Sequence, residues 1–143
     1  MPSHWIAHGR CARLGSVIRL LVIGIGGFLG SVSRYLLSGA FQSLFRSATF
    51  PFGTFLVNLT GCLVIGVLAQ LAESRSFLSG TTRAFLIVGV LGGYTTFSAF
   101  AHESVNLLRA REFLLAGANV TAQVLLGLAC VWAGRIVAQL IWR

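Results

Sequence analysis

The chain has 143 residues, with 11 arginines, three glutamates and neither lysine nor aspartate, which gives a formal net charge of +8. Apolar residues make up 56% of the chain and charged residues only 10%, whereas about a quarter of the residues in a soluble domain are charged. Because so few charges cannot cover a soluble surface, the composition argues against a soluble enzyme, a disordered chain and a secreted disulfide scaffold. The arginines are dispersed at the edges of apolar runs, which argues against nucleic-acid binding and favours contact with lipid headgroups.

The apolar runs predict an all-α membrane protein with four spanning helices, because a helix needs about 20 mostly apolar residues to cross a bilayer. In chain order we expect helices over residues 18–38, 53–72, 84–108 and 113–140. Residues 1–16 are expected to form a basic N-terminal tail, and residues 17–143 a single transmembrane domain. A cleaved signal peptide is an alternative for the first run, but Arg34 precedes the small-residue site at 38–40 and three further spans follow.

Four spans place both termini on one side of the membrane. That side holds seven arginines, two of them in the tail, and the opposite side holds four. Such a weak bias leaves two alternatives open, a single orientation with cytoplasmic termini or insertion in both orientations. Insertion in both orientations would allow an antiparallel homodimer.

The first predicted helix carries Gly26, Gly30 and Arg34 at steps of four residues, so they share one face. Small residues at this spacing allow close helix contact, with the arginine reaching the membrane surface. The alternative is a dimer face whose cation stands near the entrance for an anion.

The second predicted helix carries Thr54 and Asn58 one turn apart. The amide of Asn58 offers two N–H donors and one acceptor. It could make an ordinary hydrogen bond between helices, or it could line a polar path.

The third predicted span is the most informative. Residues 86–90 are typical of an ordinary helix, but residues 92–100 (GGYTTFSAF) combine adjacent glycines with hydroxyl residues, which are poor helix interior. Because threonine and serine are good N-caps, we predict a helix that breaks near the middle of the membrane and restarts. Carbonyls at such a break suit a hard cation and the restarted N-terminus suits an anion. A glycine kink with hydroxyls bonded back to the helix is the alternative.

Phe97 and Phe100 lie one turn apart on the restarted half, and the edge of an aromatic ring carries partial positive charge. Together with the Asn58 amide they would make a donor-rich path for a small anion without a fixed counter-charge.

Three segments resemble the fluoride channel family of the CrcB or Fluc type: residues 26–35 (GGFLGSVSRY), 53–62 (GTFLVNLTGC) and 92–100. The resemblance implies a dual-topology, antiparallel homodimer with two pores in the bacterial plasma or inner membrane. Such a channel passes fluoride out of the cell passively and lowers cytoplasmic fluoride. The resemblance also implies a structural Na⁺ at the dimer interface, held by the backbone carbonyls of Gly92 and Thr95.

The resemblance further assigns roles to individual side chains. It implies that Arg34 lies near the vestibule and that Glu103 is the family's acidic residue beyond the phenylalanines. Asn119 fits a family position in the fourth helix, but Gln123 stands where a serine is expected. The implied pore residues are Asn58, Phe97, Phe100, Thr54 and Ser98.

Two other functions compete. A small four-span multidrug or cation exporter would need a membrane-buried carboxylate, and Glu73, Glu103 and Glu112 are all expected near helix ends. A non-conducting membrane subunit would explain the packing glycines but not the placement of the asparagine and the phenylalanines. No nucleophile–base constellation is present, so we do not expect an enzyme.

Overall fold

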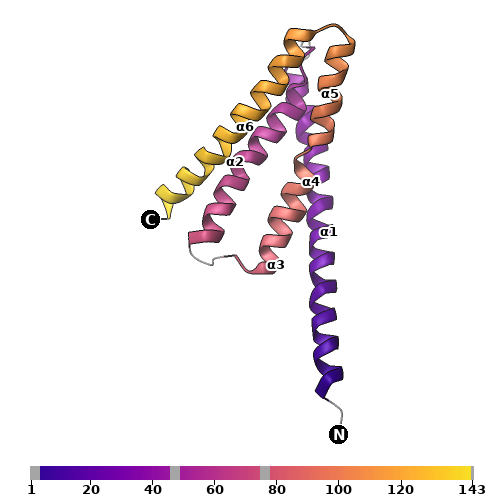
Figure 1. The fold of residues 1–143 in the computed structure, drawn as a ribbon, viewed down its shortest axis with the longest axis vertical. Coiled ribbons are helices and arrows are strands. Elements are labelled where there is room, and N and C mark those ends of the chain that lie inside the picture. Colours follow the sequence, from indigo (N-terminus) through magenta and orange to yellow (C-terminus); the bar gives the residue numbers. More distant parts are fainter. Residues whose placement is uncertain (1–3, 46–48, 75–77, 143) are drawn as a thin grey trace.

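The computed structural model describes residues 4–45, 49–74 and 78–142, and all regular structure in them is helical. The elements in chain order are α1 (His4–Leu44), α2 (Phe52–Ser74), α3 (Gly80–Arg83), the π-helix η1 (Ala84–Leu91), α4 (Gly92–Tyr94), α5 (Phe97–Arg109) and α6 (Phe113–Ile141) (Figure 1). Four stretches are long and apolar enough to cross a membrane: Gly15–Leu44, Phe52–Glu73, Gly80–Arg109 and Phe113–Ile141. The prediction of four spans is therefore confirmed.

The first helix is longer than the predicted 18–38. It has 41 residues, which at 1.5 Å per residue is roughly 60 Å, about twice the thickness of the hydrocarbon layer. Its N-terminal part runs on past the ends of the other helices (Figure 1). The helix includes most of the predicted tail because residues 4–16 contain no proline to stop it.

The third span is assembled from α3, η1, α4 and α5. Residues 86–90 were predicted as ordinary helix, and that prediction is wrong, because they lie in a π-helix, in which each N–H bonds to the carbonyl five residues earlier. Between α4 and α5, Thr95 and Thr96 are extended, with φ/ψ of −87°/155° and −150°/115°.

Residues 92–100 were expected to break the third span, and within them Gly92 and Gly93 are helical in α4. A Cβ on Gly93 would lie 2.5 Å from the carbonyl oxygen of Gly27. The glycine pair therefore lets α4 approach α1, and the interruption falls at the two threonines that follow.

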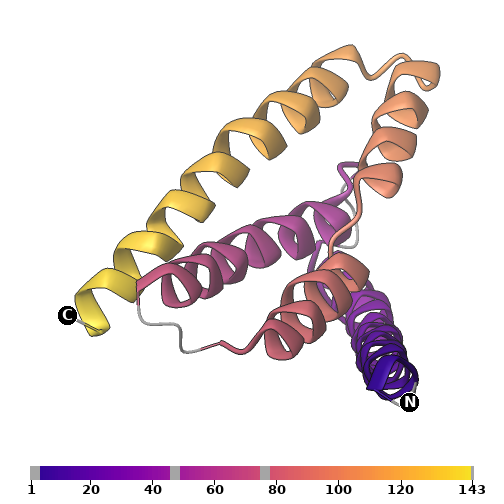
Figure 2. The same ribbon diagram turned by 60° about the horizontal axis from the view of Figure 1, so that its bottom comes forward.

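The spans pack as pairs. Helix α2 lies along α6, and η1 with α4 lies along α1, while α5 reaches the near end of α6 (Figures 1 and 2). Each pair depends on glycine: a Cβ on Gly30 would lie 2.1 Å from the Val90 oxygen, and one on Gly134 would lie 2.2 Å from the Leu63 oxygen. The structure thus confirms the packing interpretation of the glycine face on the first helix.

A tight turn joins α5 to α6. The N–H of Arg111 donates to the Leu108 carbonyl (3.1 Å) and that of Glu112 donates to the Leu107 carbonyl (2.9 Å), the Schellman pattern. Arg111 has a φ of 62°, in the left-handed region that favours glycine. The turn brings α5 and α6 together beside the interruption.

Candidate functional site

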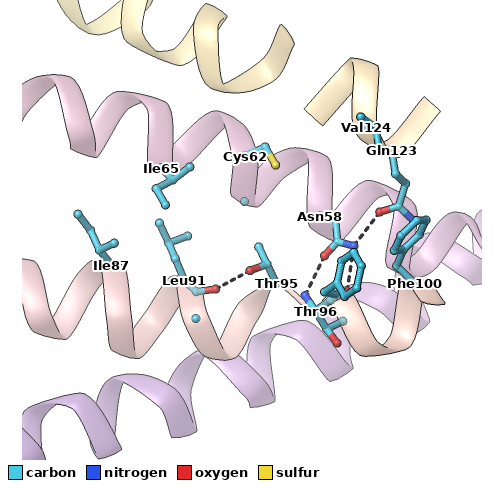
Figure 3. Close-up of a pocket in the computed structure, with 13 residues that line it drawn as sticks. Asn58, Cys62, Ile65, Ile87, Leu91, Thr95, Thr96, Phe100, Gln123 and Val124 are labelled. Atoms are coloured by element: carbon cyan, nitrogen blue, oxygen red, sulfur yellow. Dashed lines mark hydrogen bonds between the residues drawn. The ribbon is translucent and has the colours of Figure 1, made fainter. Parts of the chain in front are cut away.

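A pocket of about 370 Å³ lies beside the threonine interruption, between α2, the third span and α6 (Figure 3). No charged side chain of the described residues lines this interruption pocket. Apolar walls with a few amide and hydroxyl groups make it a site for a small ligand that neutral donors can hold. It is lined by Asn58, Gly61, Cys62, Ile65, Ile87, Leu91, Gly92, Thr95, Thr96, Phe97, Phe100, Gln123 and Val124.

Asn58 pairs with the main chain of Thr96 at the interruption. The Thr96 N–H donates to Oδ1 of Asn58 (2.9 Å), and Nδ2 of Asn58 donates to the Thr96 carbonyl (3.2 Å). The hydrogen bond between helices that the sequence allowed is therefore present. The hydroxyl of Thr96 accepts from the N–H of Ala99 (3.2 Å), so threonine caps the restarting helix as predicted.

These bonds leave two carbonyls without their helical donors. In a continuous α-helix the carbonyls of Gly92 and Thr95 would accept from the N–H groups of Thr96 and Ala99. Those N–H groups instead donate to Asn58 Oδ1 and Thr96 Oγ1. Hard cations bind through oxygen, so the two carbonyls have the chemistry that Na⁺ requires.

The side chain of Arg34 reaches the same helix end. Its Nε donates to the carbonyl of Gly93 (3.0 Å), so the guanidinium binds the main chain of α4. The hydroxyl of Thr95 donates to the Leu91 carbonyl (3.0 Å), which is the back-bonding that the kink alternative expected.

The two phenylalanines both line the interruption pocket. Their ring centroids are 5.4 Å apart with an interplanar angle of 57°. Phe100 is 9% exposed, whereas Phe97 is 79% exposed. Ser98 does not line the pocket; its exposed hydroxyl forms a hydrogen bond with that of Thr96 (3.2 Å). One copy of the chain therefore covers only one of the two rings.

Gln123 and Asn119 of α6 extend the polar contacts of Asn58. Nδ2 of Asn58 donates to Oε1 of Gln123 (2.8 Å), and Nε2 of Gln123 donates to Oδ1 of Asn119 (3.2 Å). Nδ2 of the fully buried Asn119 donates to the Ser104 hydroxyl (2.9 Å), which donates to the Phe100 carbonyl (2.8 Å). Sequence reasoning missed Ser104, although its place one turn after Phe100 puts its hydroxyl on the same face of α5.

Thr54 and Glu103 form a separate pair. The Thr54 hydroxyl donates to Oε1 of Glu103 (2.5 Å), and Oε2 of Glu103 is buried without a partner among the described residues. Glu103 lies in α5, which ends at Arg109, one residue beyond the predicted end of this helix. Glu73, near the end of α2, pairs with Arg135 of α6.

Neither Thr54 nor Glu103 lines the interruption pocket. Thr54 lines a pocket of about 400 Å³ together with Arg34, Ser31 and Ser38, and Glu103 lines another of about 310 Å³. Within the described part of the chain, the predicted pore residue Thr54 therefore lies in a different pocket from Asn58 and the phenylalanines. Thr96 lines both the interruption pocket and the pocket that contains Thr54.

The fold and the site define a small multi-pass membrane protein with a polar site at an interruption of its third span. The chain belongs to the CrcB-like protein family (Camphor Resistance, CrcB), which it matches over residues 21–135.

The similar relatives are named as channels. A fluoride-specific ion channel of Flavobacterium psychrophilum is 41% identical over 120 residues, covering 84% of this chain and 96% of the relative. Those of Opitutus terrae and Nitrosococcus oceani are 45% and 42% identical, covering 82% and 86% of this chain and 90% and 98% of the relatives. With its four apolar spans, the chain is a multi-pass protein of the cell membrane and not an enzyme.

Proposed function

We propose that this protein is a fluoride-selective channel that lets fluoride leave the cell passively and so lowers cytoplasmic fluoride. The names of the relatives support this function. The observation that carries it is the interruption pocket, which is lined by amide side chains, threonines and two phenylalanines but by no charged side chain of the described residues. Neutral donors let a small anion enter without trapping it.

The competing functions fit the pocket less well. A proton-coupled cation exporter needs a carboxylate that meets the substrate, and the buried oxygen of Glu103 lies outside the interruption pocket. A non-conducting subunit would have no use for amides and phenylalanines gathered around a pocket. Fluoride conduction accounts for both features.

The channel we propose is an antiparallel homodimer. Gly92, Ser98 and Phe97 are exposed in one copy, although they lie within a span. Lipid cannot satisfy the main chain of an interrupted helix, so protein must cover it, and a second copy is the covering surface we propose. The weak arginine bias supports insertion in both orientations.

The proposed Na⁺ lies where the two copies meet, held by the carbonyls of Gly92 and Thr95. These carbonyls lack helical donors, which supports the assignment. When bound, the cation supplies a fixed positive charge that links the interrupted helices of the two copies.

Flux measurement in liposomes tests the function. Protein reconstituted into fluoride-loaded liposomes should release fluoride, recorded with a fluoride electrode, once a potassium ionophore balances the charge. Chloride-loaded liposomes should release nothing above the level of protein-free liposomes. Absence of fluoride efflux, or chloride efflux at the same rate, would reject the proposal.

A further inference from the structure

The polar contacts beside the interruption form a relay in which every donor points the same way. It runs through five hydrogen bonds, from the Thr96 N–H through Asn58, Gln123, Asn119 and Ser104 to the Phe100 carbonyl. Figure 3 shows its first two bonds, from Thr96 to Asn58 and from Asn58 to Gln123.

The two ends of the relay fix the orientation of every amide in it. A main-chain N–H can only donate and a main-chain carbonyl can only accept. Ser104 has one hydroxyl hydrogen, which goes to the Phe100 carbonyl, so its oxygen must accept from Asn119. Oδ1 of Asn119 then faces Gln123, whose Nε2 must point to it.

Asn58 has no donor left for an anion. Its Nδ2 carries two hydrogens, one directed to the Thr96 carbonyl (3.2 Å) and the other to Oε1 of Gln123 (2.8 Å). Gln123 differs in this respect. Its Nε2 also carries two hydrogens, but only the one directed to Asn119 has a partner among the described residues.

Gln123 lines the interruption pocket together with both phenylalanines. We propose that the second N–H of Gln123 is the side-chain donor that holds the permeating anion in this pocket. Asn58 is then a positioning residue, which fixes Gln123 through its Oε1 and fixes the interruption through Thr96. This inference rests on the proposed fluoride conduction.

The substitution Gln123→Glu removes the proposed donor, and in its ionised form it also repels an anion. A glutamate oxygen still accepts from Asn58, so that contact survives. An ionised carboxylate has no hydrogen to give, and a protonated one has a single O–H, which the relay directs to Asn119. In both states the pocket loses its donor, and only the protonated form keeps the contact with Oδ1 of Asn119.

The first readout is the NMR signal of the Gln123 side-chain amide. The protein is labelled with ¹⁵N in its glutamine side chains, and the NMR signals of Gln123 are assigned by their loss in Gln123→Glu. Fluoride should shift one Nε2–H signal of Gln123, whereas chloride at equal Na⁺ should not. The signals of Gln42, Gln70 and Gln139 serve as internal controls. Signals of Gln123 that stay fixed at saturating fluoride would overturn the inference.

The second readout is flux. Gln123→Glu should raise the half-saturating fluoride concentration at least about tenfold, because the pocket loses one hydrogen-bond donor and the ionised carboxylate repels the anion. Leu128→Met, on the lipid-exposed face of the same helix, should match the wild type. A Gln123→Glu protein with wild-type saturation would overturn the donor role, with the channel function intact. A wild type without fluoride flux would overturn both proposals.

Discussion

Asn58 organises the site at the scale of single residues. Its amide replaces the helical hydrogen bonds that Thr96 loses at the interruption, and the same amide fixes the side chain of Gln123. One side chain therefore determines both the backbone path and the polar lining of the interruption pocket.

Asn58→Asp removes both donations while keeping the acceptor for the Thr96 N–H. The Thr96 carbonyl and Oε1 of Gln123 would then face a carboxylate, which also repels an anion. We expect fluoride flux to fall by roughly two orders of magnitude, because each lost hydrogen bond leaves an unpaired buried acceptor.

Asn106→Asp is the matched control for that substitution. Asn106 is exposed on α5 and bonds to His102 (3.1 Å), so the same chemical change lies outside the interruption pocket. Both variants should elute from size exclusion like the wild type. Normal flux in Asn58→Asp would remove Asn58 from the conduction site.

Sequence reasoning could name Asn58 because polar residues are rare in apolar spans, and the family resemblance pointed to Asn119 and Gln123. It could not order them into a relay, because the direction of each amide depends on Ser104 and on main-chain groups of another span.

At the scale of elements, the third span departs most from its sequence pattern. Low helix propensity predicted a break but not its position. Gly92 and Gly93 remain helical because contact with α1 stabilises α4, and the break lies at Thr95 and Thr96, where Asn58 provides replacement bonds. Local propensity cannot report such contacts, whereas the four uncharged runs predicted the spans themselves.

Gly30→Ala tests the contact that aligns the interrupted span. The added Cβ would meet the Val90 oxygen at 2.1 Å and the Tyr94 nitrogen at 2.8 Å, and main-chain atoms cannot rotate away. We expect a cost of about 1–3 kcal/mol, measured as a lower midpoint of unfolding in detergent.

Gly24→Ala is the control on the same helix. A Cβ there meets nothing within 4 Å, and alanine favours the helix by up to about 1 kcal/mol. Its unfolding midpoint should equal or exceed that of the wild type. Equal midpoints for the two alanine variants would show that α1 and the third span are not in close contact.

At the scale of the whole molecule, the single chain leaves part of the site exposed. Phe100 is buried by its own chain, but Phe97 and the interrupted main chain around Gly92 and Ser98 face outward. The exposed face of the site is therefore the surface on which we expect the second copy and the cation.

Removal of Na⁺ tests this assembly. Replacing Na⁺ exhaustively with N-methyl-D-glucamine should lower both fluoride flux and the dimer fraction, and returning Na⁺ should restore both.

The variant Thr95→Val should keep the same Na⁺ dependence, because the Thr95 hydroxyl donates to Leu91 and the proposed ligand is the backbone carbonyl. A dimer that conducts equally without Na⁺ would contradict the cation assignment. Loss of Na⁺ dependence in Thr95→Val would instead show that the hydroxyl takes part, which the main-chain geometry does not predict.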